Sequence, residues 1–142
     1  MKDNDGGCKL KILHLTINRK WFNMIKSGQK EEEYLEIKDY WAQQLISFSR
    51  YFDYDDLQEI IENMRCPLTR HSSVSDLMSF FNIEFKSFDI ARFKNGYAKN
   101  AETFDAKIQK ITIAQGDPEL GAEHIAKYYF VIYLDPISVD EK

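Results

Sequence analysis

Residues 27–41 read SGQKEEEYLEIKDYW, and in this stretch one lysine and three glutamates directly precede a run of alternating apolar and polar residues. Alternate side chains of a strand share one face, so Glu33 and Leu35 would lie on the same side of it. The spacing therefore predicts a strand with unusual charge at its start. Gly28 is suited to the left-handed end of a preceding helix, and Lys30 follows it in the turn that leads into the strand.

The residues on the N-terminal side of this stretch predict a strand followed by a short helix. Residues 9–17, KLKILHLTI, alternate in a way that is typical of a strand buried largely on both faces. Asn18 can cap a helix, because its side-chain oxygen can accept a hydrogen bond from the first turn. The apolar face of that helix would consist of Trp21, Phe22 and Ile25. We expect these three side chains to pack in the core.

The middle of the chain, from residue 39 to about residue 84, is predicted to be a helical insertion. Apolar residues recur there at helical intervals in three groups: Trp41, Leu45 and Phe48; Leu57, Ile60, Ile61 and Met64; and Val74, Leu77, Met78 and Phe81. This period predicts three helices. Ser73 or Ser75 can begin the last of them.

The second half of the chain predicts three further strands, at residues 84–96, 102–116 and 127–134. In the middle one the apolar residues change phase near Gln109, which predicts a bulge or bend of the kind that curls small sheets into barrels. The order of elements favours a single α+β domain over residues 9–135, with a small mixed or antiparallel barrel. Residues 1–8 and 136–142 would be flexible tails.

The composition is typical of a globular protein, with 142 residues of which 30% are charged and 44% hydrophobic. No apolar run approaches the roughly 20 residues that cross a bilayer, and MKDNDGGC lacks the apolar stretch of a secretion signal, so we expect a cytoplasmic protein without a membrane partner. The net charge of −4 argues against indiscriminate binding to nucleic acid. Six basic and three acidic residues occupy residues 86–110, whereas residues 51–64 contain five acidic residues and no basic one. The molecule would therefore have a basic side and an acidic side.

The cysteines and histidines do not form a recognisable metal-binding or disulfide pattern. Cys8 lies in a glycine-containing segment and Cys66 precedes a proline, and we expect both to be reduced thiols. His14, His71 and His124 are far apart in the sequence. The sequence therefore predicts no metal site and no cofactor.

The pattern of a strand, a short aromatic helix and then G-x-K-x-x-E resembles the ASCH domain, a member of the PUA-like barrel superfamily. In this chain the pattern consists of Gly28, Lys30 and Glu33. The second half is also similar to that family, in the segments FKNGYAKN and GDPELGAE and in the final apolar strand. The resemblance covers about residues 9–135, and the helical insertion is its least similar part. The family pattern usually continues to an arginine two residues beyond the glutamate, where this chain has Leu35.

The resemblance implies a β-barrel with a cleft beside the first helix that binds RNA or modified nucleosides. Some members of the family are amidohydrolases that remove an acetyl group from acetylated cytidine with a lysine, a threonine nucleophile and a glutamate. A few relatives have been described as ribonucleases. Lys30 matches the lysine of the amidohydrolases, but Glu33 stands at the position of the threonine. If the chain is an enzyme, Lys30 and Glu33 would be its acid and base.

Lys30 and Glu33 have two alternative interpretations. As members of a site, the carboxylate would accept a hydrogen bond from the exocyclic amine of cytosine or adenine, and the ammonium group would meet a carbonyl or phosphate oxygen. Alternatively, the three glutamates are solvated charges that discourage edge-to-edge pairing of strands. We expect Lys30 and Glu33 to line the site, and Glu31 and Glu32 to face solvent.

A second candidate site is the segment ARFKNGYAKN, residues 91–100. In it an Asn-Gly turn is followed by Tyr97, and the cations around that tyrosine are Arg92, Lys94 and Lys99. A stacking surface beside cations is what a site for single-stranded nucleic acid requires. The alternative is an ordinary hairpin turn with an exposed tyrosine.

The sequence therefore predicts an RNA- or nucleotide-binding module with a cleft for a nucleobase. The residues expected to line that cleft are Lys20, Lys30, Glu33, Arg92, Asn95, Tyr97 and Lys99. One alternative is an enzyme that acts on RNA or on a modified nucleoside through Lys30 and Glu33. Another is a protein-interaction module whose contact surface is the acidic helical insertion.

Overall fold

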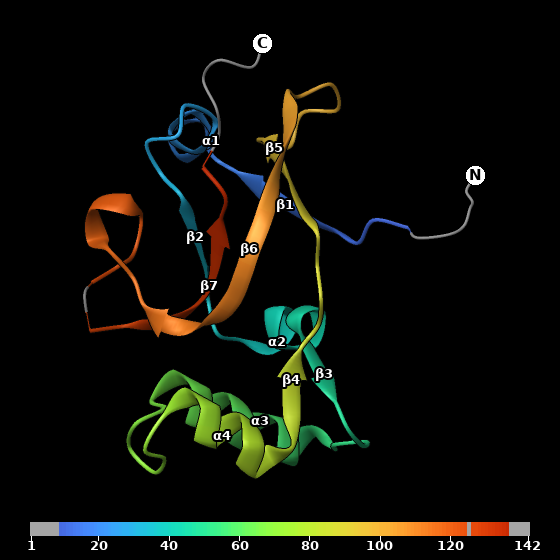
Figure 1. The fold of residues 1–142 in the computed structure, drawn as a ribbon, viewed down its shortest axis with the longest axis vertical. Helices are drawn as coiled ribbons and strands as arrows, with labels where there is room; N and C mark the ends of the chain where they lie inside the picture. Colours follow the sequence, from blue (N-terminus) through green and yellow to red (C-terminus); the bar gives the residue numbers. More distant parts are fainter. Residues whose placement is uncertain (1–8, 125, 137–142) are drawn as a thin grey trace. The chain divides into compact units, whose positions relative to one another are not determined.

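The computed structural model of the chain describes residues 9–124 and 126–136 (Figure 1). These residues form four α-helices, seven β-strands and one short 3-10 helix, η1 (Pro118–Leu120), which confirms the predicted α+β class. The described residues fall into two compact units. The first unit comprises residues 9–32, 87–110 and 133–136, and the second comprises residues 33–86, 111–124 and 126–132.

The main sheet is mixed. Strand β1 (Ile12–Ile17) pairs in parallel with β5 (Ile90–Asn95), and β5 pairs antiparallel with β6 (Thr103–Gln115). The order of the five strands is β1-β5-β6-β7-β2, where β7 is Tyr128–Leu134 and β2 is Glu32–Leu35. Strand β1 therefore forms one edge of the sheet.

Strand β1 buries only one of its faces. Leu13 and Leu15 are buried, whereas His14 between them is exposed. The expectation of burial on both faces is therefore wrong. His14 lies opposite Arg92 of β5, which in turn lies opposite Asp105 of β6, so charged groups occupy this face and keep it in contact with water.

Helix α1 (Arg19–Lys26) begins and ends where the sequence predicts. The side-chain oxygen of Asn18 accepts a hydrogen bond of 3.1 Å from a backbone N–H of the first turn. Phe22 and Ile25 are fully buried, as expected for the apolar face. Gly28 follows the helix with a φ of 86°, a left-handed conformation that glycine adopts without strain.

The second unit contains three of the four α-helices and a two-stranded antiparallel sheet (Figure 1). Its elements are α2 (Asp39–Leu45), β3 (Ile46–Phe48), α3 (Tyr54–Arg65), α4 (Val74–Phe81) and β4 (Ile83–Phe85). The side chains of Asp53 and Ser73 cap α3 and α4 through hydrogen bonds from backbone N–H groups, at 2.8 and 3.0 Å. Three helices are thus present where the apolar period predicts them, and Ser73 begins the last.

Two boundaries in this region differ from the expectation. Phe48, predicted to belong to a helix, lies on β3, where it is opposite Ile83 of β4. Pairing with a distant segment decides the conformation there, because periodicity over a few residues cannot distinguish a helix from a strand. The strand predicted over residues 84–96 is divided into β4 and β5, with residues 86–89 outside both.

Strand β6 confirms the change of phase that was predicted near Gln109. Ala106 and Ile108 are buried, Gln109 and Lys110 are both exposed, and burial resumes at Ile113. Two adjacent exposed residues interrupt the alternation of a flat strand, as a bend or bulge does.

Two tyrosines of the second unit hold the turn between β6 and β7. The backbone N–H of Asp117 donates to the hydroxyl oxygen of Tyr34 at 3.1 Å, and that of Glu123 donates to the hydroxyl oxygen of Tyr129 at 2.7 Å. Gly116 packs closely here: a Cβ atom on it would lie 2.6 Å from a neighbouring methyl group and 3.3 Å from each ring. Only glycine fits this position without a shift of its neighbours.

The predicted tails lie outside the described residues, apart from Pro136, which is exposed. Within the described part of the chain, no helix has both the length and the apolar character that crossing a bilayer requires, and the longest, α3, has 12 residues.

Candidate nucleic-acid interface

Helix α1 and the turn between β5 and β6 lie at the same end of the first unit. The parallel register places the end of β1 opposite the end of β5, and the backbone N–H of Gly96 donates to the carbonyl oxygen of Ile17 at 2.9 Å. Ile17 directly precedes the cap of α1. Glu102 is the last residue of the turn, and its carboxylate pairs with the ammonium group of Lys26 at the other end of the helix. The turn, residues 96–102, is therefore joined to the chain just before the start of α1 and to the last residue of that helix.

This end of the first unit is rich in positive charge. Helix α1 contains three basic residues and no acidic one, and one of the three, Lys26, pairs with Glu102. The end of β5 and the turn contribute two more lysines. Apart from the paired Lys26, four cations remain, and we call them the basic end: Arg19, Lys20, Lys94 and Lys99. Their concentration on a chain of net charge −4 gives the first unit a local positive surface.

Lys30 is buried beside α1. The residue is 2% exposed, and its backbone N–H donates to the carbonyl oxygen of Met24 at 2.9 Å. Its ammonium nitrogen lies 4.3 Å from the centroid of the Trp21 ring, and the ammonium nitrogen of Lys20 lies 4.6 Å from the same ring. An aromatic face stabilises a cation by about 0.5–1 kcal/mol in water and by about 2 kcal/mol where water is excluded. Trp21, predicted as a core residue, is only half-buried, and its ring lies beside two ammonium groups.

Tyr97 stands on the turn with 88% of its surface exposed. Gly96 before it has a φ of 81°, and no described atom lies within 4 Å of the position that a Cβ atom would take there. An exposed ring on an open turn offers a face on which a nucleobase can stack. Asn95 ends β5 just before this turn and Lys99 lies within it, so three predicted site residues are close in the chain, and Lys20 lies on α1.

The three glutamates differ in burial. Glu31 is exposed, Glu32 is half-buried, and Glu33 is 7% exposed. The interpretation as solvated charges therefore suits Glu31 but neither Glu33 nor Lys30. Glu33 belongs to the second unit and Lys30 to the first, and their shared role in a site stays a prediction.

Arg92 forms a bidentate ion pair with a carboxylate that the sequence did not suggest. Its Nε and Nη2 atoms donate to the two carboxylate oxygens of Asp105, at 2.8 and 2.9 Å. The hydrogen bond from Arg92 lowers the pKa of Asp105, and the same bond raises the pKa of Arg92. Arg92 is thus held on the polar face of the sheet, in a row with His14.

Replacement of Arg92 with glutamine is expected to raise the pKa of Asp105 toward its ordinary value of about 3.9. Because the pKa of Asp105 is depressed in the folded state, the ion pair stabilises the fold at pH values above the ordinary pKa of an aspartate. That stabilisation disappears as the pH falls through the lower pKa of the folded state. Both side chains are more than 40% exposed, so the effect on stability at neutral pH should be small. NMR titration of the Asp105 carboxyl carbon measures the change, and equal values in the two proteins would contradict the ion pair.

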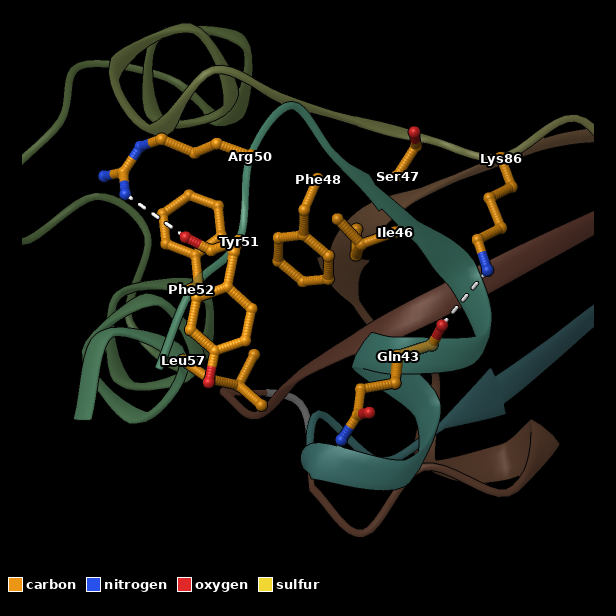
Figure 2. Close-up of a pocket in the computed structure, with 9 residues that line it drawn as sticks. All are labelled: Gln43, Ile46, Ser47, Phe48, Arg50, Tyr51, Phe52, Leu57 and Lys86. Carbon is orange, nitrogen blue, oxygen red and sulfur yellow. Dashed lines mark hydrogen bonds between the residues drawn. The ribbon is translucent and has the colours of Figure 1, made fainter. Parts of the chain in front are cut away.

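The second unit contains a pocket that the sequence did not predict. The pocket has a volume of about 440 Å³ and is formed by the end of α2, by β3, by the segment that leads into α3, and by the residue that follows β4 (Figure 2). Its main apolar side chains are Ile46, Phe48, Tyr51 and Phe52. Two cations also line it, and Figure 2 shows Arg50 and Lys86 on opposite sides of these rings.

The run SFSRYF, residues 47–52, is the sequence signal for this pocket. Three aromatic residues and one arginine occupy six positions of a connection between helices. The helical spacing of Phe48 after Leu45 suggests ordinary core packing instead. Lys86 comes from beyond β4, so no local pattern indicates that it meets the run.

The acidic helix α3 packs as the sequence predicts. Ile60, Ile61 and Met64 are buried, whereas Glu59 and Glu62 are exposed on the opposite side. A partner protein for this acidic surface stays a prediction.

The described histidines lie in separate places. His14 is exposed on β1. The Nε2 atom of His71 lies 3.2 Å from the side-chain oxygen of Asn63. Across residues 9–124 and 126–136, no three His, Cys, Asp or Glu side chains are grouped as ligands for a metal ion. Cys66 is a free, exposed thiol, and Cys8 lies outside the described residues.

No family model, no curated protein and no solved structure matches the chain. The resemblance to ASCH domains therefore stays a prediction that rests on Gly28, Lys30 and Glu33 and on the segments FKNGYAKN and GDPELGAE with the final apolar strand. Leu35, at the position of the family's arginine, is 7% exposed and is an ordinary buried residue of β2.

Proposed function

We propose that the chain is an RNA- or nucleotide-binding protein that holds single-stranded RNA against the basic end of the first unit. The observation that supports this most directly is the hydrogen bond from Gly96 to Ile17, because it joins the turn that carries the exposed Tyr97 to the residue that precedes the cap of α1. An exposed tyrosine alone would suit an ordinary hairpin turn. A tyrosine within a group of cations is the combination that binds single-stranded nucleic acid.

The residues of this surface have distinct roles in the proposal. Lys20 and Lys99 contact phosphates, and each contact releases a counterion from the RNA. Tyr97 stacks on a base, a contact worth about 1–3 kcal/mol. The amide of Asn95 has donors and an acceptor for the edge of that base. Phosphate contacts thus position the RNA, and base contacts set its sequence preference.

Lys30 supplies a fixed positive charge to the same surface. Its ammonium group is held over Trp21 and is almost removed from solvent. The field of a buried charge is screened less by salt and water than that of an exposed lysine. Lys30 therefore keeps its ammonium group beside α1 without a further entropic cost of ordering a flexible side chain when RNA binds.

We also propose that the fold is a PUA-like barrel of the ASCH type. The order β1, α1 and β2 supports this, because Gly28 and Lys30 lie in the turn between the helix and the second strand, as the resemblance requires. The mixed sheet, with β1 parallel to β5, also agrees with it. A fold alone does not identify a ligand, so RNA binding has to be tested at the residues of the basic end.

Binding of labelled single-stranded RNA over a series of salt concentrations tests the proposal. The logarithm of the affinity should fall linearly with the logarithm of the salt concentration, with a slope of about −0.7 for each phosphate contacted. Lys20→Gln and Lys99→Gln should each weaken binding and reduce the magnitude of the slope by about 0.7. Tyr97→Ala should lower the affinity about tenfold while leaving the slope unchanged.

Lys107→Gln is the matched control for these variants. Lys107 is an exposed lysine of β6 that lies opposite Ile90, at the other end of β5 from the turn. Its replacement should leave RNA affinity unchanged. An equal loss in this variant would mean that RNA is attracted by charge alone, and the absence of binding at low salt would overturn the proposal. The length of the RNA after incubation distinguishes binding from the alternative of cleavage.

A further inference from the structure

We infer that the pocket of the second unit binds a nucleoside phosphate, with the base against its aromatic side chains and the phosphate on Arg50. Every residue that lines this pocket belongs to the second unit. The inference therefore does not rest on RNA binding at the basic end of the first unit. The two sites can be tested with separate sets of variants.

The pocket has the size and the walls of a site for a small planar ligand. Its volume of about 440 Å³ falls within the range of roughly 300–1,000 Å³ that ligand pockets occupy. Ile46 forms a buried apolar wall, and the rings of Phe48 and Phe52 meet at 66° with their centroids 5.3 Å apart. Tyr51, at the edge of this apolar pocket, is 84% exposed, so its ring face is open to a ligand. A base that stacks on Tyr51 would cover a surface that water now contacts.

Arg50 is prepared to receive a phosphate group. The central carbon of its guanidinium group lies 4.3 Å from the centroid of the Phe52 ring, so one face of the group is supported by an aromatic side chain. One nitrogen donates to the backbone carbonyl oxygen of Tyr51 at 3.4 Å. A guanidinium group has five N–H donors, so a fork for two phosphate oxygens remains. Figure 2 shows this group beside the ring of Phe52 and joined to the backbone carbonyl of Tyr51.

Lys86 places a second positive charge on the opposite side of the rings. Its ammonium nitrogen donates to the backbone carbonyl oxygen of Gln43 at 3.2 Å, which leaves two of its three donors for a ligand. Among the described residues, neither Lys86 nor Arg50 has a carboxylate at ion-pair distance, and the lining of the pocket contains no acidic residue. A carbonyl oxygen of the base is a suitable partner for Lys86.

The charges favour an aromatic anion over other small ligands. A purely apolar ligand would fill the space beside Phe48 but would leave both cations without a role. A simple anion such as inorganic phosphate would pair with Arg50 but would not cover Tyr51. A nucleoside phosphate satisfies both features, because it combines a flat ring system with a negative charge on one flexible arm.

Titration of the full chain with nucleoside 5′-monophosphates, with the matching nucleosides and with inorganic phosphate tests this inference. Isothermal titration calorimetry gives the affinities, and NMR shifts of residues 46–52 locate the ligand. The monophosphate should bind at least tenfold more tightly than the nucleoside, and inorganic phosphate should compete weakly. Binding of all three compounds with equal affinity, or of none of them, would overturn the inference.

Two variants separate the contributions of the phosphate and the base. Arg50→Gln should reduce the affinity for the monophosphate to that for the nucleoside, because only the phosphate contact is removed. Tyr51→Ala should weaken both ligands about tenfold, since the stacking surface is lost. Both side chains are exposed, so both variants should fold. Tyr54→Ala, which removes another exposed tyrosine only three positions further on, is the matched control and should change neither affinity.

A further comparison distinguishes a free nucleotide from the end of an RNA chain. If the ends of RNA chains also enter the pocket, a short RNA with a 5′-phosphate should bind more tightly than the same RNA without it. This difference in affinity would have the same direction as that between the monophosphate and the nucleoside. Lys20→Gln and Lys99→Gln should leave binding of the monophosphate unchanged. If these two variants abolish it while Tyr51→Ala does not, the nucleotide binds at the basic end and the inference about the pocket is wrong.

Discussion

Lys30→Met should lower the affinity for single-stranded RNA at least about tenfold while the chain stays folded. Methionine keeps the length and flexibility of the lysine stem, so the packing beside α1 is largely retained. The variant loses a positive charge at a residue that is only 2% exposed and lies over Trp21. A tenfold change corresponds to about 1.4 kcal/mol, a modest amount for a charge that solvent screens poorly.

Two further variants show whether this loss comes from charge or from packing. Lys30→Ala also removes the buried stem, so its free energy of unfolding should fall by about 2–4 kcal/mol. Lys107→Met removes an exposed charge from β6 and should alter neither stability nor RNA binding. Calorimetric unfolding and RNA titration are measured on all three proteins. If Lys30→Met binds RNA as tightly as the wild type while its unfolding temperature falls, Lys30 has a structural role only.

The parts of the fold that the sequence predicts well are those that local interactions determine. Helix α1 depends on the cap at Asn18, on its own apolar face and on Gly28, all within a short stretch of chain. Its bounds could therefore be predicted. Phe48 shows the opposite case, because its conformation depends on Ile83, a partner that no local pattern indicates.

The candidate site follows the same division. Tyr97 and Lys20 could be singled out separately, from a turn signal and from a helix. That the turn and α1 lie at one end of the first unit depends on the parallel pairing of β1 with β5, which is set by the register of two strands far apart in the sequence. The ion pair of Arg92 with Asp105 depends on the register of β5 with β6, and the sequence alone did not reveal it. Residue types were thus predictable, and their partners were not.

Phe22→Ala should reduce the free energy of unfolding by about 3–5 kcal/mol. Phe22 is fully buried, and its ring meets that of Phe104 edge to face with centroids 5.0 Å apart. Phe104 in turn stacks on Phe93, at 5.4 Å and an angle of 26°. Each aromatic pair adds about 0.5–1.5 kcal/mol to the effect of burial alone. Because Phe22 is on α1 and the other two rings are on β5 and β6, this cluster fixes the helix to the sheet within the first unit.

The consequence for function can be measured with a milder variant. Phe22→Leu keeps an apolar side chain in the same space and should cost only about 1–2 kcal/mol. Lys20→Gln, on the same helix, should change stability by less than about 0.5 kcal/mol, because Lys20 is exposed. Denaturant unfolding gives these differences.

Phe22→Leu should also weaken RNA binding while it is still fully folded, since the helix that positions Lys20 and Trp21 is less firmly held. A loss of stability below about 1 kcal/mol for Phe22→Ala would show that the three rings do not anchor α1. The arrangement of the basic end would then need another cause.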